Sequence, residues 1–198
     1  MRVLVATTNP GKLREIGPLL ADTPITLVTL KDLPPIPEPE ETGATFWENA
    51  RLKALAYGAA SGLLTIAEDS GLVIDAMGGE PGVRSARFLG EGVSYADRFA
   101  EIYRRLAAVP PERRTARFVT ALAVADGRNL RFETEATVEG RIADRPSGEG
   151  GFGYDPIFLY PPFGTTTAAL SPSDKAAISH RARAFRDCAR WLHEEIPS

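Results

Sequence analysis

The sequence lacks the features that mark several large protein classes. Its 198 residues contain one cysteine, Cys188, which excludes an intrachain disulfide and a cysteine-rich metal site and suits a reducing compartment. No apolar run of about 18 residues is present, so no membrane-spanning helix is predicted. Neither sign of charge dominates, because 23 basic and 26 acidic residues give a formal net charge of −3. This balance argues against a nucleic-acid-binding protein.

The hydrophobic pattern alternates between strand and helix character along the whole chain, without internal repeats. The predicted strands cover residues 3–6, 25–30, 63–67, 72–76, 116–125, 130–138 and 157–160. The predicted helices cover residues 12–22, 42–61, 94–108 and 172–195, and Gly17-Pro18 predicts a kink or an early end in the first of them. The hairpin around residues 126–129 excludes a purely parallel sheet. We therefore predict an α/β fold with a mixed sheet, as a single domain over residues 1–198.

The start of the chain predicts a phosphate-binding loop. A buried strand leads through Thr7-Thr8-Asn9-Pro10-Gly11 into a helix, and backbone N–H groups at such a helix N-terminus bind phosphate. Lys12 adds a positive charge. The loop matches neither the Walker pattern nor the dinucleotide fingerprint, so an ordinary turn with a surface lysine stays the alternative. Because the strand begins directly after Met1-Arg2, without a signal peptide, we expect a cytoplasmic location.

Two acidic pairs predict a metal site. Glu40-Glu41 closes a proline-rich loop, and Glu68-Asp69 is expected at the end of a buried strand. Carboxylate oxygens are the ligands that Mg²⁺ prefers, and one carboxylate could deprotonate a water molecule. Solvated or helix-capping acids are the alternative interpretation.

One face of the second predicted helix is polar. Its residues are spaced by three and four positions, and they are Thr42, Thr45, Asn49 and Lys53. The stripe is either a solvated helix face or an extension of a polyphosphate site toward Glu41 and Asp69.

Residues near the C-terminus are typical of purine recognition. In Phe152-Gly153-Tyr154-Asp155 an aromatic ring flanked by glycine can lie beneath a base. Arg181 can donate two hydrogen bonds to a six-keto oxygen and the neighbouring ring nitrogen, whereas adenine would leave it unpaired. Lys175 would diverge from Arg181 on a straight helix, so both reach a ligand only with a local irregularity or a long reach. His180 is either part of this recognition site or an ordinary hydrogen-bonded helix residue.

These segments together resemble the inosine triphosphate pyrophosphatase family over residues 3–186. The matching motifs are Thr7-Thr8-Asn9-Pro10-Gly11-Lys12, Glu40-Glu41-Thr42-Gly43, Phe46-Trp47-Glu48-Asn49-Ala50, Glu68-Asp69-Ser70-Gly71-Leu72, Gly78-Gly79-Glu80-Pro81-Gly82, Gly151-Phe152-Gly153-Tyr154-Asp155-Pro156 and Lys175-Ala176-Ala177-Ile178-Ser179-His180-Arg181. The chain departs from the family at Thr8, where many members have glycine, and at Glu68, where many bacterial members have aspartate.

The resemblance implies an elongated α/β structure of two lobes around a long mixed sheet with flanking helices, and a substrate cleft between the lobes. It implies a Mg²⁺-dependent homodimer that hydrolyses the triphosphates of inosine, deoxyinosine and xanthosine to monophosphate and pyrophosphate. Phosphates would be held by Thr7, Thr8, Asn9, Pro10, Gly11, Lys12 and Lys53. Asp69 would be general base and metal ligand, Glu40 or Glu41 a further metal ligand, and Ser70 a substrate contact. The base would be surrounded by Phe152, Gly153, Tyr154, Asp155, Lys175, His180 and Arg181.

Two other functions remain open from the sequence. One is a pyrophosphatase for other modified nucleotides, such as methylated or pyrimidine triphosphates. The other is a nucleotide-binding protein without catalysis, although a pure sensor would have no need of Lys12, Glu41 and Asp69 together.

Overall fold

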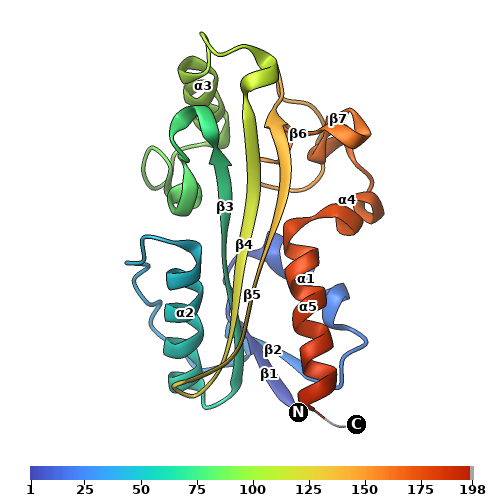
Figure 1. Ribbon diagram of the computed structural model, residues 1–198. Helices are drawn as coiled ribbons and strands as arrows, with labels where there is room; N and C mark the ends of the chain where they lie inside the picture. Colours follow the sequence, from blue (N-terminus) through green and yellow to red (C-terminus); the bar gives the residue numbers. More distant parts are fainter. Residues whose placement is uncertain (197–198) are drawn as a thin grey trace. The chain divides into compact units, whose positions relative to one another are not determined.

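The computed structural model describes residues 1–196. A seven-stranded sheet has the order β2-β1-β3-β4-β5-β6-β7 (Figure 1). Its strands are β1 (Arg2–Val5), β2 (Thr26–Thr29), β3 (Leu64–Ile74), β4 (Thr115–Asp126), β5 (Asn129–Ile142), β6 (Phe158–Tyr160) and β7 (Thr165–Thr166). The α-helices are α1 (Pro10–Leu20), α2 (Phe46–Ser61), α3 (Tyr95–Arg105), α4 (Pro172–Ile178) and α5 (His180–Glu195). Short 3₁₀ helices are η1 (Leu30–Asp32), η2 (Asp75–Met77), η3 (Gly82–Arg87), η4 (Pro111–Arg113), η5 (Asp155–Ile157), η6 (Pro161–Phe163) and η7 (Thr167–Ala169).

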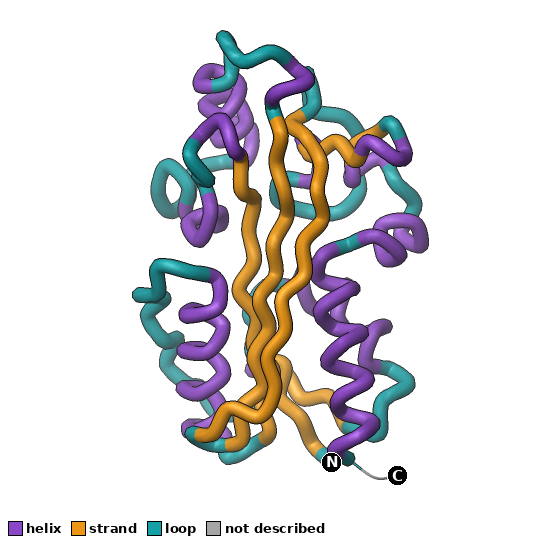
Figure 2. The backbone as a smooth tube through the Cα atoms, viewed as in Figure 1, coloured by secondary structure: helices purple, strands orange, loops and turns teal. Residues whose placement is uncertain are grey.

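The sheet is mixed, which confirms the predicted α/β class. β1 pairs with β2 and β3 in parallel, whereas β6 pairs with β5 and β7 in antiparallel fashion. The predicted hairpin is present, because β4 and β5 are neighbours joined by a two-residue connection (Figure 2). No helix among residues 1–196 is long and apolar enough to cross a membrane.

The chain divides into two compact units. Unit 1 comprises residues 1–69 and 120–136 together with the described residues from 180 onward, and unit 2 comprises residues 70–119 and 137–179. Strands β3, β4 and β5 contribute residues to both units.

Successive side chains along the strands of unit 1 point to opposite faces of the sheet, and each face has its own apolar core. Val3 and Val5 point to the side on which Ile16 of α1 and Phe185 of α5 are buried. Leu4, between them, belongs to the opposite core, which includes alanines of α2 and β4. Figure 1 shows α1 and α5 on one side of these strands and α2 on the other. Both faces are therefore covered, as expected for parallel strands with continuous apolar runs.

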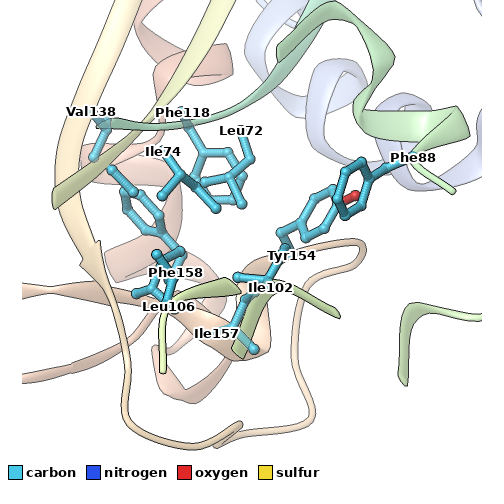
Figure 3. Close-up of a cluster of buried hydrophobic side chains, with 12 residues drawn as sticks. Leu72, Ile74, Phe88, Ile102, Leu106, Phe118, Val138, Tyr154, Ile157 and Phe158 are labelled. Carbon is cyan, nitrogen blue, oxygen red and sulfur yellow. The ribbon is translucent and has the colours of Figure 1, made fainter. Parts of the chain in front are cut away.

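Unit 2 has its own apolar core. Leu72 and Ile74 of β3 are fully buried together with Ile102 of α3 (Figure 3). The rings of Phe118 and Phe158 lie 4.3 Å apart within the same cluster. The core anchors α3 and the segment from Tyr154 to Phe158 on strands β3 to β6.

The prediction that Glu68-Asp69 ends a strand is wrong. β3 runs without interruption from Leu64 to Ile74, so both acids lie in its middle. β1 covers β3 only as far as Val5 opposite Ile66, and the Ala6 amide donates to the Ile66 carbonyl. The acids thus lie just beyond the carboxyl end of β1, while β3 itself continues beside β4.

The predicted helices differ from the observed ones in their limits, most clearly in the last of them. The predicted helix 172–195 is two helices, because Ser179 has extended backbone angles (φ −56°, ψ 137°). The local irregularity between Lys175 and Arg181 is therefore present. α1 does not end early, since it continues through Pro18 to Leu20.

Candidate active site

The loop after β1 is organised by Asn9. Its side-chain oxygen accepts hydrogen bonds from the amides of Gly11 (2.8 Å) and Lys12 (3.2 Å), so Asn9 caps α1. The Thr7 hydroxyl in turn accepts from the Asn9 amide at 3.2 Å. Two of the amides at the start of this helix are thus satisfied within the protein. A phosphate that used them would have to displace the Asn9 side chain.

A lysine lies between two carboxylates in unit 1. The ammonium of Lys53 donates to Glu41 Oε1 at 2.7 Å and to Asp69 Oδ1 at 3.0 Å. Asn49, one turn earlier on α2, donates to Asp69 Oδ2 at 3.3 Å, and its side-chain oxygen accepts from the Gly43 amide at 2.8 Å. The polar stripe of α2 therefore does extend toward Glu41 and Asp69 at Asn49 and Lys53. Thr45 instead caps the helix by accepting from the Glu48 amide, and Thr42 precedes the helix.

A second charged cluster surrounds Glu68. Its Oε1 accepts from Arg181 Nε at 2.7 Å and lies 3.4 Å from Lys12 Nζ. Arg181 also donates from a terminal nitrogen to Glu15 Oε2. The side chains of Glu68 and Arg181 are 2% and 4% exposed, so this ion pair is shielded from water.

The pKa values of the two neighbouring acids shift in opposite directions. Burial raises the pKa of Asp69 above its ordinary value, and the nearby Lys53 opposes this only in part. Burial also acts against ionisation of Glu68, but Arg181 and Lys12 outweigh it and hold the pKa of Glu68 far below its usual range. Of the two carboxylates, Asp69 is therefore the stronger base.

The charges of these two clusters leave capacity for a cation. Three cationic side chains, Lys12, Lys53 and Arg181, face four acids, Glu15, Glu41, Glu68 and Asp69, which gives a sum of −1. Glu68 Oε2 is buried and has no hydrogen-bond partner among residues 1–196. Within the described part of the chain no three histidine, cysteine or acidic side chains form a ready-made metal site. Mg²⁺ commonly uses one or two protein carboxylates together with substrate phosphates. Glu41, Glu68 and Asp69 are the carboxylates that this site offers.

The predicted base-binding residues of unit 2 gather around Asp155. Its Oδ2 accepts from the Phe152 amide at 2.8 Å and from Lys175 Nζ at 2.6 Å. Lys175 Nζ also stands 5.3 Å from the centre of the Phe152 ring. Thr167 donates to Asp155 Oδ1 at 2.7 Å. Phe152, Asp155 and Lys175 therefore form one connected group.

Tyr154 points into the core rather than toward this group. It is 4% exposed, and its hydroxyl donates to the Ser85 carbonyl at 2.9 Å. Its ring meets that of Tyr95 edge-on, with 5.3 Å between the centroids. A base contact from position 154 is therefore expected from the backbone and not from the ring.

The remaining predicted residues lie as follows. His180 is buried at the start of α5 in unit 1, next to Arg181. Ser70 follows Asp69 in β3 and is half-buried. Thr8 and Glu40 are exposed, and neither side chain takes part in the described contacts of the charged clusters.

Glu15 belongs to this site, although the sequence predicts no role for it. Its carboxylate pairs with Arg181, 166 residues further along the chain. The available signal was its position three residues after Lys12 on α1, which places both side chains on one face of the helix. That spacing is common on solvated helices, so it does not single out Glu15.

Known proteins are similar to this chain in sequence and fold. A family model described as Ham1 family matches residues 3–191. A dITP/XTP pyrophosphatase of Geobacillus kaustophilus is 50% identical over 92% of this chain and 90% of its own length. A second protein with that name, from Symbiobacterium thermophilum, is 49% identical over 96% of this chain and 94% of its own length.

Solved structures agree with the family match. A HAM1 protein from Coxiella burnetii has a TM-score of 0.88 at 37% identity and covers 98% of this chain and 99% of its own. The Ham1 protein of Staphylococcus aureus also has a TM-score of 0.88, at 36% identity, with 98% and 100% coverage. The resemblance seen in the sequence motifs is thus confirmed, and the chain belongs to the Ham1 family.

Proposed function

We propose that this protein hydrolyses non-standard purine nucleoside triphosphates, those of inosine, deoxyinosine and xanthosine, to the monophosphate and pyrophosphate. The observation that carries the proposal is the environment of Asp69. This carboxylate has a raised pKa and is held by Lys53 and Asn49, in the same unit as Lys12. A poised base beside two ammonium groups suits attack of water on a phosphoanhydride. The names of the family relatives point to the same reaction.

The lysines would gather the phosphates. Lys12 lies at the start of α1, and burial lowers its pKa, although Glu68 opposes that effect. Lys53 keeps its charge, because Asp69 and Glu41 outweigh its burial and raise its pKa. Both ammonium groups are partly shielded from solvent, which strengthens their attraction to phosphate oxygens. The Thr7–Lys12 segment would orient the phosphates, with Thr8 contributing from the exposed side of the loop.

Asp69 would accept the proton of the attacking water. The water oxygen forms a bond to the α-phosphorus, and the bond from that phosphorus to the bridging oxygen breaks. Pyrophosphate leaves with the electron pair of the broken bond, while Lys12 and Lys53 offset the developing negative charge. Glu68 is a poor base, since Arg181 and Lys12 hold its pKa low, and it would instead orient these two cations.

The proposal includes Mg²⁺, for which the orphaned oxygen of Glu68 and the oxygen-rich donor set are suited. Asp69 and Glu41 would be ligands, with Glu40 or Glu68 as further candidates. When bound, the metal ion would neutralise phosphate oxygens and polarise the phosphorus. By the family resemblance the proposal also includes a homodimer and a cytoplasmic location.

Base recognition is assigned to the residues that the family resemblance predicts. Phe152 offers a ring face, and Lys175 and Arg181 offer donors that match the six-keto oxygen of hypoxanthine and xanthine. Gly153, Tyr154, Asp155, His180 and Ser70 complete the proposed substrate contacts. A purine with an amino group at that position would place a donor against these donors instead of an acceptor, so we expect adenine to be rejected.

The position of attack gives a test of the proposed reaction. Hydrolysis of inosine triphosphate in water enriched in oxygen-18 should place the label in the monophosphate, because the water oxygen becomes bonded to the α-phosphorus. Mass spectrometry of both products measures this. Label in the pyrophosphate would mean attack at the β-phosphorus and would contradict the assignment.

A further inference from the structure

We propose that Thr167 is a positioning residue for base recognition. Its hydroxyl fixes the carboxylate of Asp155, which in turn fixes Lys175 and the backbone of Phe152. The inference rests on the proposed function in one respect, since it takes Phe152 and Lys175 as contacts of the base. The contacts that carry it lie entirely within unit 2.

The two carboxylate oxygens of Asp155 accept hydrogen bonds from different donors. Oδ2 accepts from the Phe152 amide (2.8 Å) and from Lys175 Nζ (2.6 Å). Oδ1 accepts from the Thr167 hydroxyl at 2.7 Å, whereas the Asp155 carbonyl is 3.2 Å from the same hydroxyl. A hydroxyl has one proton, and the shorter contact shows that it goes to Oδ1. Thr167 thus determines which oxygen is left to hold Lys175 and Phe152.

Two neighbouring threonines hold both ends of the glycine-rich loop 147–155. Thr166 donates to the Ser147 carbonyl at 2.6 Å, at the start of the loop, and Thr167 holds Asp155 at its end. Between them the Gly150 amide donates to the Ala168 carbonyl at 2.9 Å. Both threonines are at most 5% exposed, so water does not compete for their hydroxyl groups. The loop that carries Phe152 is therefore fastened to the segment 166–168.

Close contacts at Gly151 restrict the orientation of the Asp155 side chain. Gly151 has φ +71°, and a Cβ there would lie 2.2 Å from Asp155 Oδ2 and 2.8 Å from Lys175 Nζ. The backbone, the carboxylate and the ammonium are thus in direct contact. Because Asp155 is 4% exposed, loss of the Thr167 hydroxyl would leave a charged oxygen without this donor in a dry site. The carboxylate would then turn toward another donor and carry Lys175 and Phe152 with it.

The test compares Thr167→Val, which removes the hydroxyl at nearly constant shape, with Thr167→Ser, which keeps it. Thr65→Val is the matched control, because Thr65 is also buried and its hydroxyl donates to the Leu63 carbonyl in unit 1. For inosine triphosphate we expect Thr167→Val to raise KM about tenfold, as for loss of one hydrogen bond to a charged group, with kcat changed less than about threefold. Thr167→Ser should restore KM, and Thr65→Val should leave it unchanged.

Hydrogen exchange of the Phe152 amide provides a second readout without substrate. Thr167→Val should accelerate it about tenfold, as the amide loses its fixed acceptor, and Thr167→Ser should not. If the wild-type protein hydrolyses no nucleotide, the proposed function fails, but this exchange still tests the link from Thr167 to Phe152. Unchanged exchange in Thr167→Val overturns the inference. So does a KM equal to that of the wild type, or a serine variant that behaves like valine.

Discussion

Replacing Asp69 by asparagine is expected to lower kcat for inosine triphosphate by about 10³-fold, the range of a lost general base. Asparagine has the same shape and can still accept from Lys53, so the contacts that hold the site remain largely in place. It cannot accept the proton of the attacking water. Nucleotide binding should persist, which isothermal titration with inosine triphosphate measures beside the loss of turnover.

A matched control separates this effect from any general change in the protein. Asp126 lies exposed at the end of β4, where it pairs with Arg131 at 3.6 Å outside the charged clusters. Asp126→Asn should keep kcat within about twofold of the wild type, as for most surface substitutions. If Asp69→Asn is also active at that level, Asp69 is not the base.

Removal of the Arg181 guanidinium is the second change with a large expected effect. Arg181→Met keeps most of the aliphatic stem but leaves the buried Glu68 with Lys12 at 3.4 Å as its remaining ion-pair partner. We expect the free energy of unfolding to fall by about 3–5 kcal/mol, the usual cost of breaking a buried ion pair from one side. Denaturant unfolding measures it. Any folded fraction should also show a smaller preference for inosine over adenosine triphosphate.

Two further variants identify the cause of that loss. Arg190→Met on the same helix removes an arginine whose side chain is 77% exposed, and it should change stability by less than about 0.5 kcal/mol. Adding Glu68→Gln to Arg181→Met should recover part of the loss, because the uncompensated buried charge is gone. Additive losses in the double variant would show that the pair is not energetically coupled. An equal loss of activity for inosine and adenosine triphosphates would count against base reading by Arg181.

Local patterns were sufficient to predict most of the fold. The apolar runs at 3–6 and 25–30 are β1 and β2, and the turn after Asp126 joins β4 to β5 as predicted. Thr45 and Glu48 form the predicted capping box, although α2 begins at Phe46 and not at Thr42. These signals depend on residues close together in the chain, which is why the sequence alone carries them.

Features that depend on distant residues could not be predicted. The continuity of β3 through Glu68 and Asp69 arises because β4 accompanies it beyond the end of β1, which no local pattern shows. The break at Ser179 separates α4 from α5 without any glycine or proline at that point. Glu15 joins the site only through Arg181, and a single sequence contains no signal for a pair so far apart.

The sequence predicts only some of the contacts within the two charged clusters. Lys53, Asp69 and Glu41 do meet, and their chemistry was expected from residue type alone. The separation of roles between Glu68 and Asp69 was not expected, because it comes from the placement of Arg181 and Lys12 beside only one of them. Residue types therefore predict which side chains could form a charged site, while the three-dimensional contacts show which of them meet.

The most direct test of the central claim is the release of pyrophosphate from the triphosphates of inosine, xanthosine, guanosine and adenosine, with Mg²⁺ and with EDTA. We predict fast release from the first two, lost in EDTA. Release from adenosine triphosphate should be slower by about 100-fold or more, because its six-amino group mismatches donors placed for a six-keto oxygen. Guanosine triphosphate has the same six-keto oxygen, so we expect its slower release to come from contacts near its two-amino group. Equal rates for all four nucleotides would contradict the assigned base recognition. No release from any of them would contradict the proposed function itself.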